Sequence, residues 1–266
     1  MPEFLQPQDG AEKQDSETAA AKRWLNTDHG LFPAGRLTVL GDDLHSRQPT
    51  CQHCIDHQVN FIFACLPTSD PALYDWLTYL EGNDEVHNHQ ERVWPGRDYE
   101  LRQYRYINGI PLRDAQPALW VNWCEVPVLR EADGQQGYHN AFVTLHDIND
   151  ATVAEIVTAA RARWKSENEN HNVLKTKVYH LEHNFGHGQQ HLAMTLLTLN
   201  TLAFLFHTIL HLVDDSYQRI RKQRGTRKGF FQDIQTLTKD LLFDSWQHLI
   251  DFMLDDGTTP ATGNTS

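Results

Sequence analysis

Glu167 lies where a helical pattern calls for an apolar side chain. The pattern consists of apolar or small residues at three- and four-residue steps, namely Val153, Ile156, Ala160, Trp164, Leu174 and Val178. At about 100° per residue, Glu167 falls within about 20° of Ala160 and Leu174, in the middle of this stripe. A carboxylate that faces the core is unfavourable unless a cation, here Arg163 or Lys175, pairs with it. We expect Glu167 to be held over a site; a charge pair on a helix surface is the alternative.

Asp42 is the second candidate carboxylate. It follows a short, mostly apolar run from Arg36 to Leu40 that is bounded by Gly35 and Gly41, which predicts a buried β-strand. An acid at the carboxyl end of such a strand lies where open α/β sheets bind their ligands. The alternative is a local role, in which Asp42 forms an Asx-turn or caps the helix predicted for residues 48–58.

The residues around Glu167 resemble a known enzyme family. Arg163 and Glu167 keep an Arg-x-x-x-Glu spacing, and the sequence YHLEHNFGHG begins at Tyr179. Together they resemble the C-terminal signature of insertion-sequence DDE transposases of the RNase H-like superfamily, in which this glutamate is the third catalytic acid. Two positions differ from the family pattern, because Ala160 replaces a tyrosine and Lys175 follows Glu167 by eight residues rather than seven.

The same resemblance extends to Asp42. The Gly-Asp-x-Leu sequence that starts at Gly41 is similar to the way these transposases present their second catalytic aspartate, and His45 stands where an aromatic residue is usual. Asp43 would then cap the following helix. The resemblance implies a two-metal Mg²⁺ site for DNA cleavage and strand transfer, with Asp42 and Glu167 as two of its three carboxylates. It also implies that these two side chains converge.

The first acid of the family should lie on an earlier strand. No strand pattern upstream of Arg36 ends in an aspartate, because Asp9, Asp15 and Asp28 lie in turn or helix contexts. We therefore expect the chain to be the C-terminal portion of a transposase, inactive alone, with one edge of the Leu37–Leu40 strand unpaired. A non-enzymatic DNA-binding or regulatory relic of a transposase is the alternative function, and a metal-site protein is a third.

The expected partner is DNA at the transposon ends, and a second transposase chain is a further candidate partner. The net charge of −12 argues against a general affinity for nucleic acid, so binding must rely on local basic stretches. One surrounds Glu167 and the other is RIRKQRGTRK, from Arg219 to Lys228. The candidate DNA-binding residues are Arg163, Lys175, Lys177, Arg219, Arg221, Lys222 and Arg224.

The sequence predicts an α/β fold: an incomplete RNase H-like core of two or three strands with helices, a β-rich insertion and C-terminal helices. The core comprises residues 1–80, which carry the second catalytic aspartate, and residues 141–190, which carry a strand and the Glu167 helix. Alternating aromatic and β-branched residues with intervening turns predict the insertion at residues 81–140, after a His-rich loop at 83–96. C-terminal helices follow at residues 191–256, and residues 257–266 have the composition of a disordered tail.

Two apolar segments follow the Glu167 region. Leu192 to Val213 has no charged side chain and is long enough to cross a membrane, but its polar residues favour a buried core helix. We therefore predict no membrane partner. Residues 230–254 predict one amphipathic helix. Four cysteines and the absence of a secretory signal favour a reducing, cytoplasmic setting.

Other motifs with metal-ligand or cofactor character are weaker. Cys51 and Cys54 have the spacing of zinc ligands, but no second Cys-x-x-Cys pair follows. His183, His187 and His191 recur every four residues, although Gly186 and Gly188 would interrupt a helix there. The sequence has no Walker loop, dinucleotide-binding fingerprint or nucleophile elbow, so it does not predict the corresponding nucleotide-binding or hydrolase classes.

Overall fold

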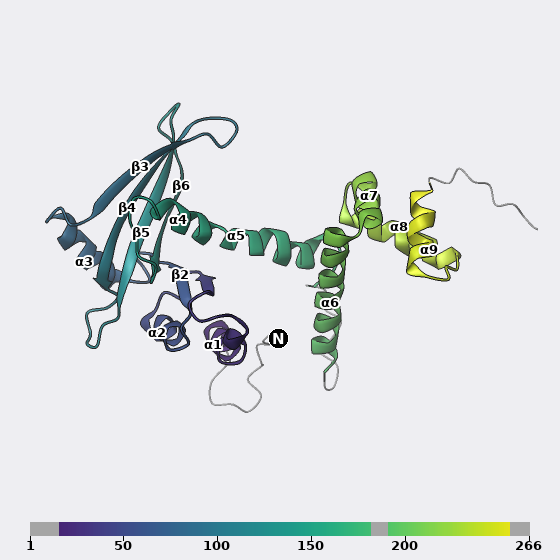
Figure 1. The fold of residues 1–266 in the computed structure, drawn as a ribbon, viewed down its shortest axis with the longest axis horizontal. Helices are drawn as coiled ribbons and strands as arrows, with labels where there is room; N and C mark the ends of the chain where they lie inside the picture. The colour runs from purple at the N-terminus through teal and green to yellow at the C-terminus, as the bar shows by residue number, and fades with distance from the viewer. Residues whose placement is uncertain (1–15, 182–190, 256–266) are drawn as a thin grey trace, which may run out of the picture. The chain divides into compact units, whose positions relative to one another are not determined.

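The computed structural model describes residues 16–181 and 191–255. It divides into two compact units, residues 1–164 and residues 165–266, whose positions relative to one another are not determined (Figure 1). Unit 1 contains the whole sheet, and unit 2 is helical in its described part. The mixed α/β class expected from the sequence is therefore confirmed for unit 1.

Unit 1 is built on one six-stranded sheet with the order β1-β2-β6-β5-β4-β3. Its strands are β1 (Thr38–Gly41), β2 (Asn60–Ala64), β3 (His87–Val93), β4 (Glu100–Pro111), β5 (Trp120–Arg130) and β6 (Gln136–Thr144). Strands β1 and β2 are parallel, with Leu40 opposite Ile62, and every other neighbouring pair is antiparallel. β1 stands at the edge of the sheet and, among the described residues, pairs only with β2, as predicted for this strand.

A short helix makes the parallel pairing of β1 and β2 possible. Parallel neighbours need a crossover, and α2 (Gln48–Asp56) provides it, close to the predicted bounds. Cys51 and Cys54 on α2 are fully buried and belong to the same core cluster as Phe61 and Phe63 of β2. The strand–helix–strand segment predicted from the sequence is confirmed, but β1 is half-buried along its length and not buried as predicted.

Alternation along β2 divides the core into two layers. Phe61 and Phe63 point toward α1 (Glu17–Asp28), α2 and α3 (Pro71–Glu81), whereas Ile62 and Ala64 point toward α4 (Val153–Arg161). A 3₁₀ turn, η1 (His29–Leu31), follows α1. Helices thus cover both faces of the sheet around β2, which explains why this strand is apolar on both sides (Figure 1).

The region predicted as a β-rich insertion continues the same sheet. β3, β4 and β5 extend it beyond β6, away from β1. The prediction of a loop at residues 83–96 was wrong, because His87–Val93 pairs residue by residue with β4. The ring of His87 stacks on that of Tyr106, and the ring of His89 stacks on that of Tyr104. These contacts allow a mostly polar segment to form an edge strand, although it buries no apolar side chain of its own.

The Glu167 helix is not one regular α-helix. After α4, the chain turns at Ala162 and continues through α5 (Arg163–Lys165) and two π-helical segments, η2 (Ser166–His171) and η3 (Val173–Lys177). The wider π turn changes the angle between successive side chains. As a result, Ala160 and Leu174 are buried as expected, but Glu167 is exposed and is not in the middle of a buried stripe.

Unit 2 has a small core formed by three helices. Its long helix α6 (Leu192–Val213) is followed by α7 (Asp215–Arg224), α8 (Arg227–Asp240) and α9 (Trp246–Leu254). The single helix predicted for residues 230–254 is two helices, because the chain is extended at Leu241 and α9 begins anew with Ser245 as its N-cap. Tyr217, Ile220, Phe230, Leu249, Ile250 and Met253 form the core.

Helix α6 has no buried residue, so the prediction of a deeply buried core helix was wrong within this unit. Its apolar residues surround the helix, and the neighbours it contacts in this unit, η3, α7 and α8, cover only part of it. Among the described residues, α6 is the one helix whose length and hydropathy of 1.7 would allow it to cross a membrane. Length and composition alone are weak evidence for a span, because core helices of soluble proteins pass the same test.

Gly41 is required by the close approach of β1 to its surroundings. A Cβ atom at this position would lie 2.8 Å from Cδ1 of Phe63 and 3.0 Å from Cβ of His45. We predict that Gly41→Ala lowers the free energy of unfolding by about 1–3 kcal/mol, because buried groups must shift to accept the methyl group. Urea unfolding would measure this change. Gly137→Ala in β6, where a Cβ has nothing within 4 Å, is the matched control, and equal effects of the two substitutions would contradict the packing argument.

Candidate functional site

Asp42 lies directly after β1, in a turn that its own carboxylate stabilises. Its Oδ1 accepts a hydrogen bond from the backbone N–H of Leu44 at 3.1 Å and lies 3.0 Å from Nδ1 of His45. The local alternative, an Asx-turn, is therefore present in the structure. The side chain of Asp42 is still 41% exposed, so the carboxylate remains accessible to a ligand.

Neither aspartate of this turn caps α2. The N-cap of α2 is Arg47, which makes no side-chain capping bond, and Pro49 occupies the first turn. The prediction that Asp43 is the capping residue was therefore wrong. Proline at this position removes one of the N–H groups that a cap would satisfy, so the helix begins without an acidic cap.

A buried acid, Asp70, lies close to the same turn. It follows β2 and is the N-cap residue of α3, and only 6% of its surface is exposed. Its Oδ2 accepts hydrogen bonds from Ser46 Oγ at 2.7 Å and from Ser69 Oγ at 2.9 Å. Ser46 is fully buried and also lies 2.9 Å from the carbonyl oxygen of Asp43. These contacts connect the turn after β1 to the turn after β2.

Sequence reasoning missed Asp70, although the rule that selected Asp42 applies to it equally. Both acids follow a strand of the parallel pair, and carboxyl ends of parallel strands meet at one edge of the sheet. The intervening Leu66-Pro67-Thr68-Ser69 makes the strand end less obvious in sequence. The buried position of Asp70 and its serine partners indicate a role in positioning the Asp42 turn.

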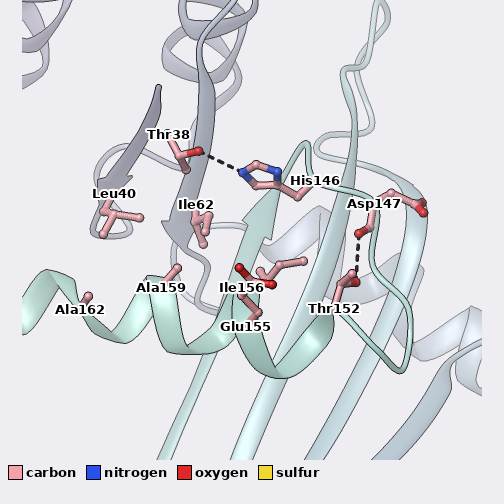
Figure 2. A pocket seen from close by; sticks show the side chains of 10 residues that line it. All are labelled: Thr38, Leu40, Ile62, His146, Asp147, Thr152, Glu155, Ile156, Ala159 and Ala162. Carbon is pink, nitrogen blue, oxygen red and sulfur yellow. Dashed lines mark hydrogen bonds between the residues drawn. The ribbon is translucent and has the colours of Figure 1, made fainter. Parts of the chain in front are cut away.

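A cavity of about 520 Å³ lies on the α4 side of β1 and β2 (Figure 2). One part of its wall is apolar and is formed by Leu40, Ile62, Ile156, Ala159 and Ala162. The other part is polar and is formed by Thr38, His146, Asp147, Thr152 and Glu155. A cavity with these two parts can accept an elongated ligand that is apolar at one end and polar at the other.

Hydrogen bonds fix the polar end of this cavity. Thr38 Oγ1 and His146 Nε2 are 3.1 Å apart, and Thr152 Oγ1 donates to the carbonyl oxygen of Asp147 at 3.2 Å (Figure 2). Sequence reasoning did not select these residues, because they come from three separate segments. In the part of the chain that the structure describes, no three His, Cys, Asp or Glu residues are arranged to hold a metal ion.

The structure does not test whether Asp42 and Glu167 converge. Asp42 belongs to unit 1 and Glu167 to unit 2, and the positions of the units relative to one another are not determined. The shared Mg²⁺ site therefore remains a prediction. Arg163 is half-buried in α5, and Lys175 is exposed in η3, as is Glu167 in η2. Nothing is described for the side chain of Lys177.

The basic stretch from Arg219 to Lys228 does not form a uniform surface. Arg219 and Lys222 are exposed on α7, as a DNA-contacting role requires. Arg224 forms an ion pair with Asp233, with 2.8 Å between Nε and Oδ2. Arg221 packs 5.9 Å from the ring of Phe230, and burial lowers its pKa from the ordinary arginine value. Of the four predicted DNA-binding residues on α7, Arg219 and Lys222 thus form no ion pair and no cation–π contact among the described residues.

No protein-family model matches the sequence, and no curated protein shows significant similarity to it. The resemblance to DDE transposases therefore depends on the residues at Asp42, Arg163 and Glu167 and on the YHLEHNFGHG sequence. Most of that sequence, including His183 and His187, lies outside the described residues, as does the predicted tail at 257–266.

The cysteines are buried and reduced. Burial raises the pKa of the Cys54 thiol to about 11 and that of Cys124 to about 12. Burial also raises the pKa values of Cys51 and Cys65, and the nearby charge of Asp70 adds to the effect at Cys65. Thiols with raised pKa values are poor metal ligands and nucleophiles, which favours a packing role for Cys51 and Cys54.

We predict that Ser46→Ala lowers the free energy of unfolding by about 1–3 kcal/mol, because it removes a buried donor from the Asp70 carboxylate. Ser69→Ala removes the other donor at a half-buried position, where water can replace the hydroxyl, and should have a smaller effect. Urea unfolding of the two variants measures the difference. A larger loss for Ser69→Ala would show that the Ser46–Asp70 contact does not connect the two turns.

Proposed function

We propose that this chain carries the second and third catalytic acids of a DDE-type transposase with an RNase H-like core. Its function by descent would be metal-dependent DNA cleavage and strand transfer. The observation that carries the proposal is the position of Asp42, an accessible carboxylate at the carboxyl end of a parallel strand at the edge of the sheet. The Arg163 and Glu167 pattern follows β6 and α4 in the chain, in the order that the resemblance implies.

The sheet supports this fold assignment at the level of its topology. A parallel β1–β2 pair joins an antiparallel set at β6, and helices cover both faces. An RNase H-like core would place further strands beyond β1, whose outer edge has no partner among the described residues. An unpaired strand edge is a template for another strand, so this edge is compatible with the proposal.

The carboxylate of Asp42 can supply one of the oxygen ligands that a Mg²⁺ ion needs. Oδ1 is engaged by Leu44 and His45, which orients the carboxylate and leaves Oδ2 for an ion. Glu167 is the second oxygen ligand in the proposal, and hard Mg²⁺ prefers such ligands. A bound ion would stabilise negative charge on the transferred phosphate and on the leaving oxygen. No strand precedes β1 in the described residues, so the structure offers no position for the first acid of the family.

We predict that the chain alone does not nick DNA that carries candidate transposon ends, with either Mg²⁺ or Mn²⁺, because no strand before β1 in the described residues supplies a third acid. Gel analysis of end-labelled duplexes would detect single cuts. Nicking that is lost in Glu167→Gln and Asp42→Asn would show that the site is complete in this chain, and that the expected inactivity is wrong.

Binding of Mn²⁺ tests the two proposed ligands without requiring activity. Electron paramagnetic resonance would measure free Mn²⁺ during titration of the full chain. Asp42→Asn and Glu167→Gln should each weaken binding, whereas the neighbouring Asp43→Asn and Glu169→Gln are matched controls and should not. Equal affinities in all four variants and the unaltered chain would remove the basis for a shared metal site.

A non-enzymatic DNA-binding or regulatory role is the second candidate, and the exposed Arg219 and Lys222 favour it. We predict that neutralising both residues lowers the slope of log K against log salt concentration by about 0.9 for each lost phosphate contact. Fluorescence anisotropy with a labelled duplex measures the slope. Arg224→Gln is the control, because Asp233 already pairs with this arginine; a slope that changes only in the control would exclude the exposed pair from DNA binding.

A further inference from the structure

Unit 2 contains two arginines whose charges interact and that form no ion pair with a carboxylate among the described residues. Arg221 on α7 and Arg227 at the start of α8 are both half-buried. The charge of Arg227 adds to burial in lowering the pKa of Arg221. Within the described part of the chain, no Asp or Glu forms an ion pair with either arginine, whereas Arg224 nearby is paired with Asp233. Two like charges in a partly buried place are unfavourable unless a negative charge joins them.

Aromatic side chains hold these arginines in place. The guanidinium carbon of Arg227 lies 5.4 Å from the ring centroid of Phe204, and its Nη1 donates to the Tyr179 hydroxyl at 3.4 Å. Arg221 faces Phe230, and its Nη1 is buried without a hydrogen-bond partner among the described residues. Aromatic rings attract the cations but do not neutralise them, so the positive charge remains uncompensated.

The charges of the same two arginines act on the pKa of His207. Burial lowers its pKa to about 4, and the charges of Arg227 and Arg221 contribute to this shift. Its Nδ1 lies 3.1 Å from the Tyr217 hydroxyl. The groups that face His207 from neighbouring elements are therefore aromatic or cationic, and the neutral imidazole adds no charge at neutral pH.

A cavity of about 440 Å³ lies next to Arg227. It is lined by Val173 and Thr176 of η3 and by Thr226, Arg227 and Lys228 at the start of α8. The hydroxyl oxygen of Thr226 accepts from the backbone N–H of Gly229 at 3.1 Å, which leaves its own proton available for a ligand. Arg227, Lys228 and Thr226 thus line one cavity with side chains that can donate hydrogen bonds, and no carboxylate is among its described lining residues.

We propose that this cavity, which we call the Arg227 cavity, binds a phosphate group. A guanidinium, an ammonium and a hydroxyl match the several acceptor oxygens and the charge of a phosphate, and arginine binds such groups with two hydrogen bonds. Arg221 is not among the described lining residues, but its charge interacts with that of Arg227. The source is either a nucleic-acid backbone or a small phosphate compound. The cavity is separate from the proposed metal ligands, and its Arg227 and Lys228 are the last two residues of the basic stretch from Arg219 to Lys228.

Inorganic phosphate is the probe for this site, titrated into the full chain at constant ionic strength. Isothermal calorimetry should show saturable binding that weakens at least about tenfold in Arg227→Gln, because a charged hydrogen bond is lost. Arg97→Gln, an exposed arginine that belongs to no proposed site, is the matched control and should keep the affinity. Equal phosphate affinity in Arg227→Gln and the unaltered chain, or binding that does not saturate, would overturn the proposal.

A second measurement covers the case in which Arg227→Gln does not fold. Lys228 is exposed, so Lys228→Gln should fold and should also weaken phosphate binding. In the unaltered chain, nuclear magnetic resonance should show that phosphate raises the pKa of His207, since the anion offsets the two arginine charges. An unchanged His207 titration together with unchanged binding by Lys228→Gln would refute the site.

Competition distinguishes the two sources of phosphate. A short DNA duplex that displaces inorganic phosphate would identify the backbone as the source, and failure to displace it would assign the cavity to a small phosphate compound. Asp42→Asn and Glu167→Gln should leave phosphate binding unchanged. The Mn²⁺ titration tests the proposed metal ligands, and the phosphate titration tests the Arg227 cavity. Either proposal can therefore be refuted while the other holds.

Discussion

The position of β2 between a parallel and an antiparallel neighbour is the constraint on which unit 1 depends. β2 pairs in parallel with β1 and antiparallel with β6, and it is buried on both faces. Phe61 and Phe63 require cover from α1, α2 and α3, whereas Ile62 and Ala64 require cover from α4. Because both layers of helices meet this strand, the turn after β1, the turn after β2 and the cavity beside α4 are all fixed by it.

Parallel pairing also brings two acidic residues to the same edge of the sheet, where the surroundings of the two carboxylates differ. Asp42 is accessible and is oriented by Leu44 and His45, whereas Asp70 is buried and satisfied by two serines. An exposed carboxylate can bind an ion, and a buried carboxylate with donors can hold the loop that presents it. This division of roles gives the Asp42 turn a defined geometry without a ligand, which is what preorganisation of a metal ligand requires.

In unit 2, aromatic side chains pack around two half-buried arginines. Arg221 and Arg227 contact Phe230 and Phe204, and His207 stays neutral near them. Such packing stabilises the guanidinium groups yet leaves their charge available, so the small core and an anion site can be built from the same side chains. The charges of Arg219 and Lys222 are exposed, so salt screens them more strongly than the half-buried charges of Arg221 and Arg227.

The sequence by itself determined the elements whose signals are local. The apolar runs of β1 and β2, the amphipathic helix between them and the acid at Asp42 were predictable because their side-chain periods and turn residues lie within a few positions. Tertiary structure decided what depends on distant partners. His87–Val93 becomes a strand only because β4 pairs with it, and Glu167 is exposed because the helix turns are π-helical. Asp70 contacts Ser46, and the half-buried Arg221 packs near Phe230, through contacts between separate segments that no local pattern encodes.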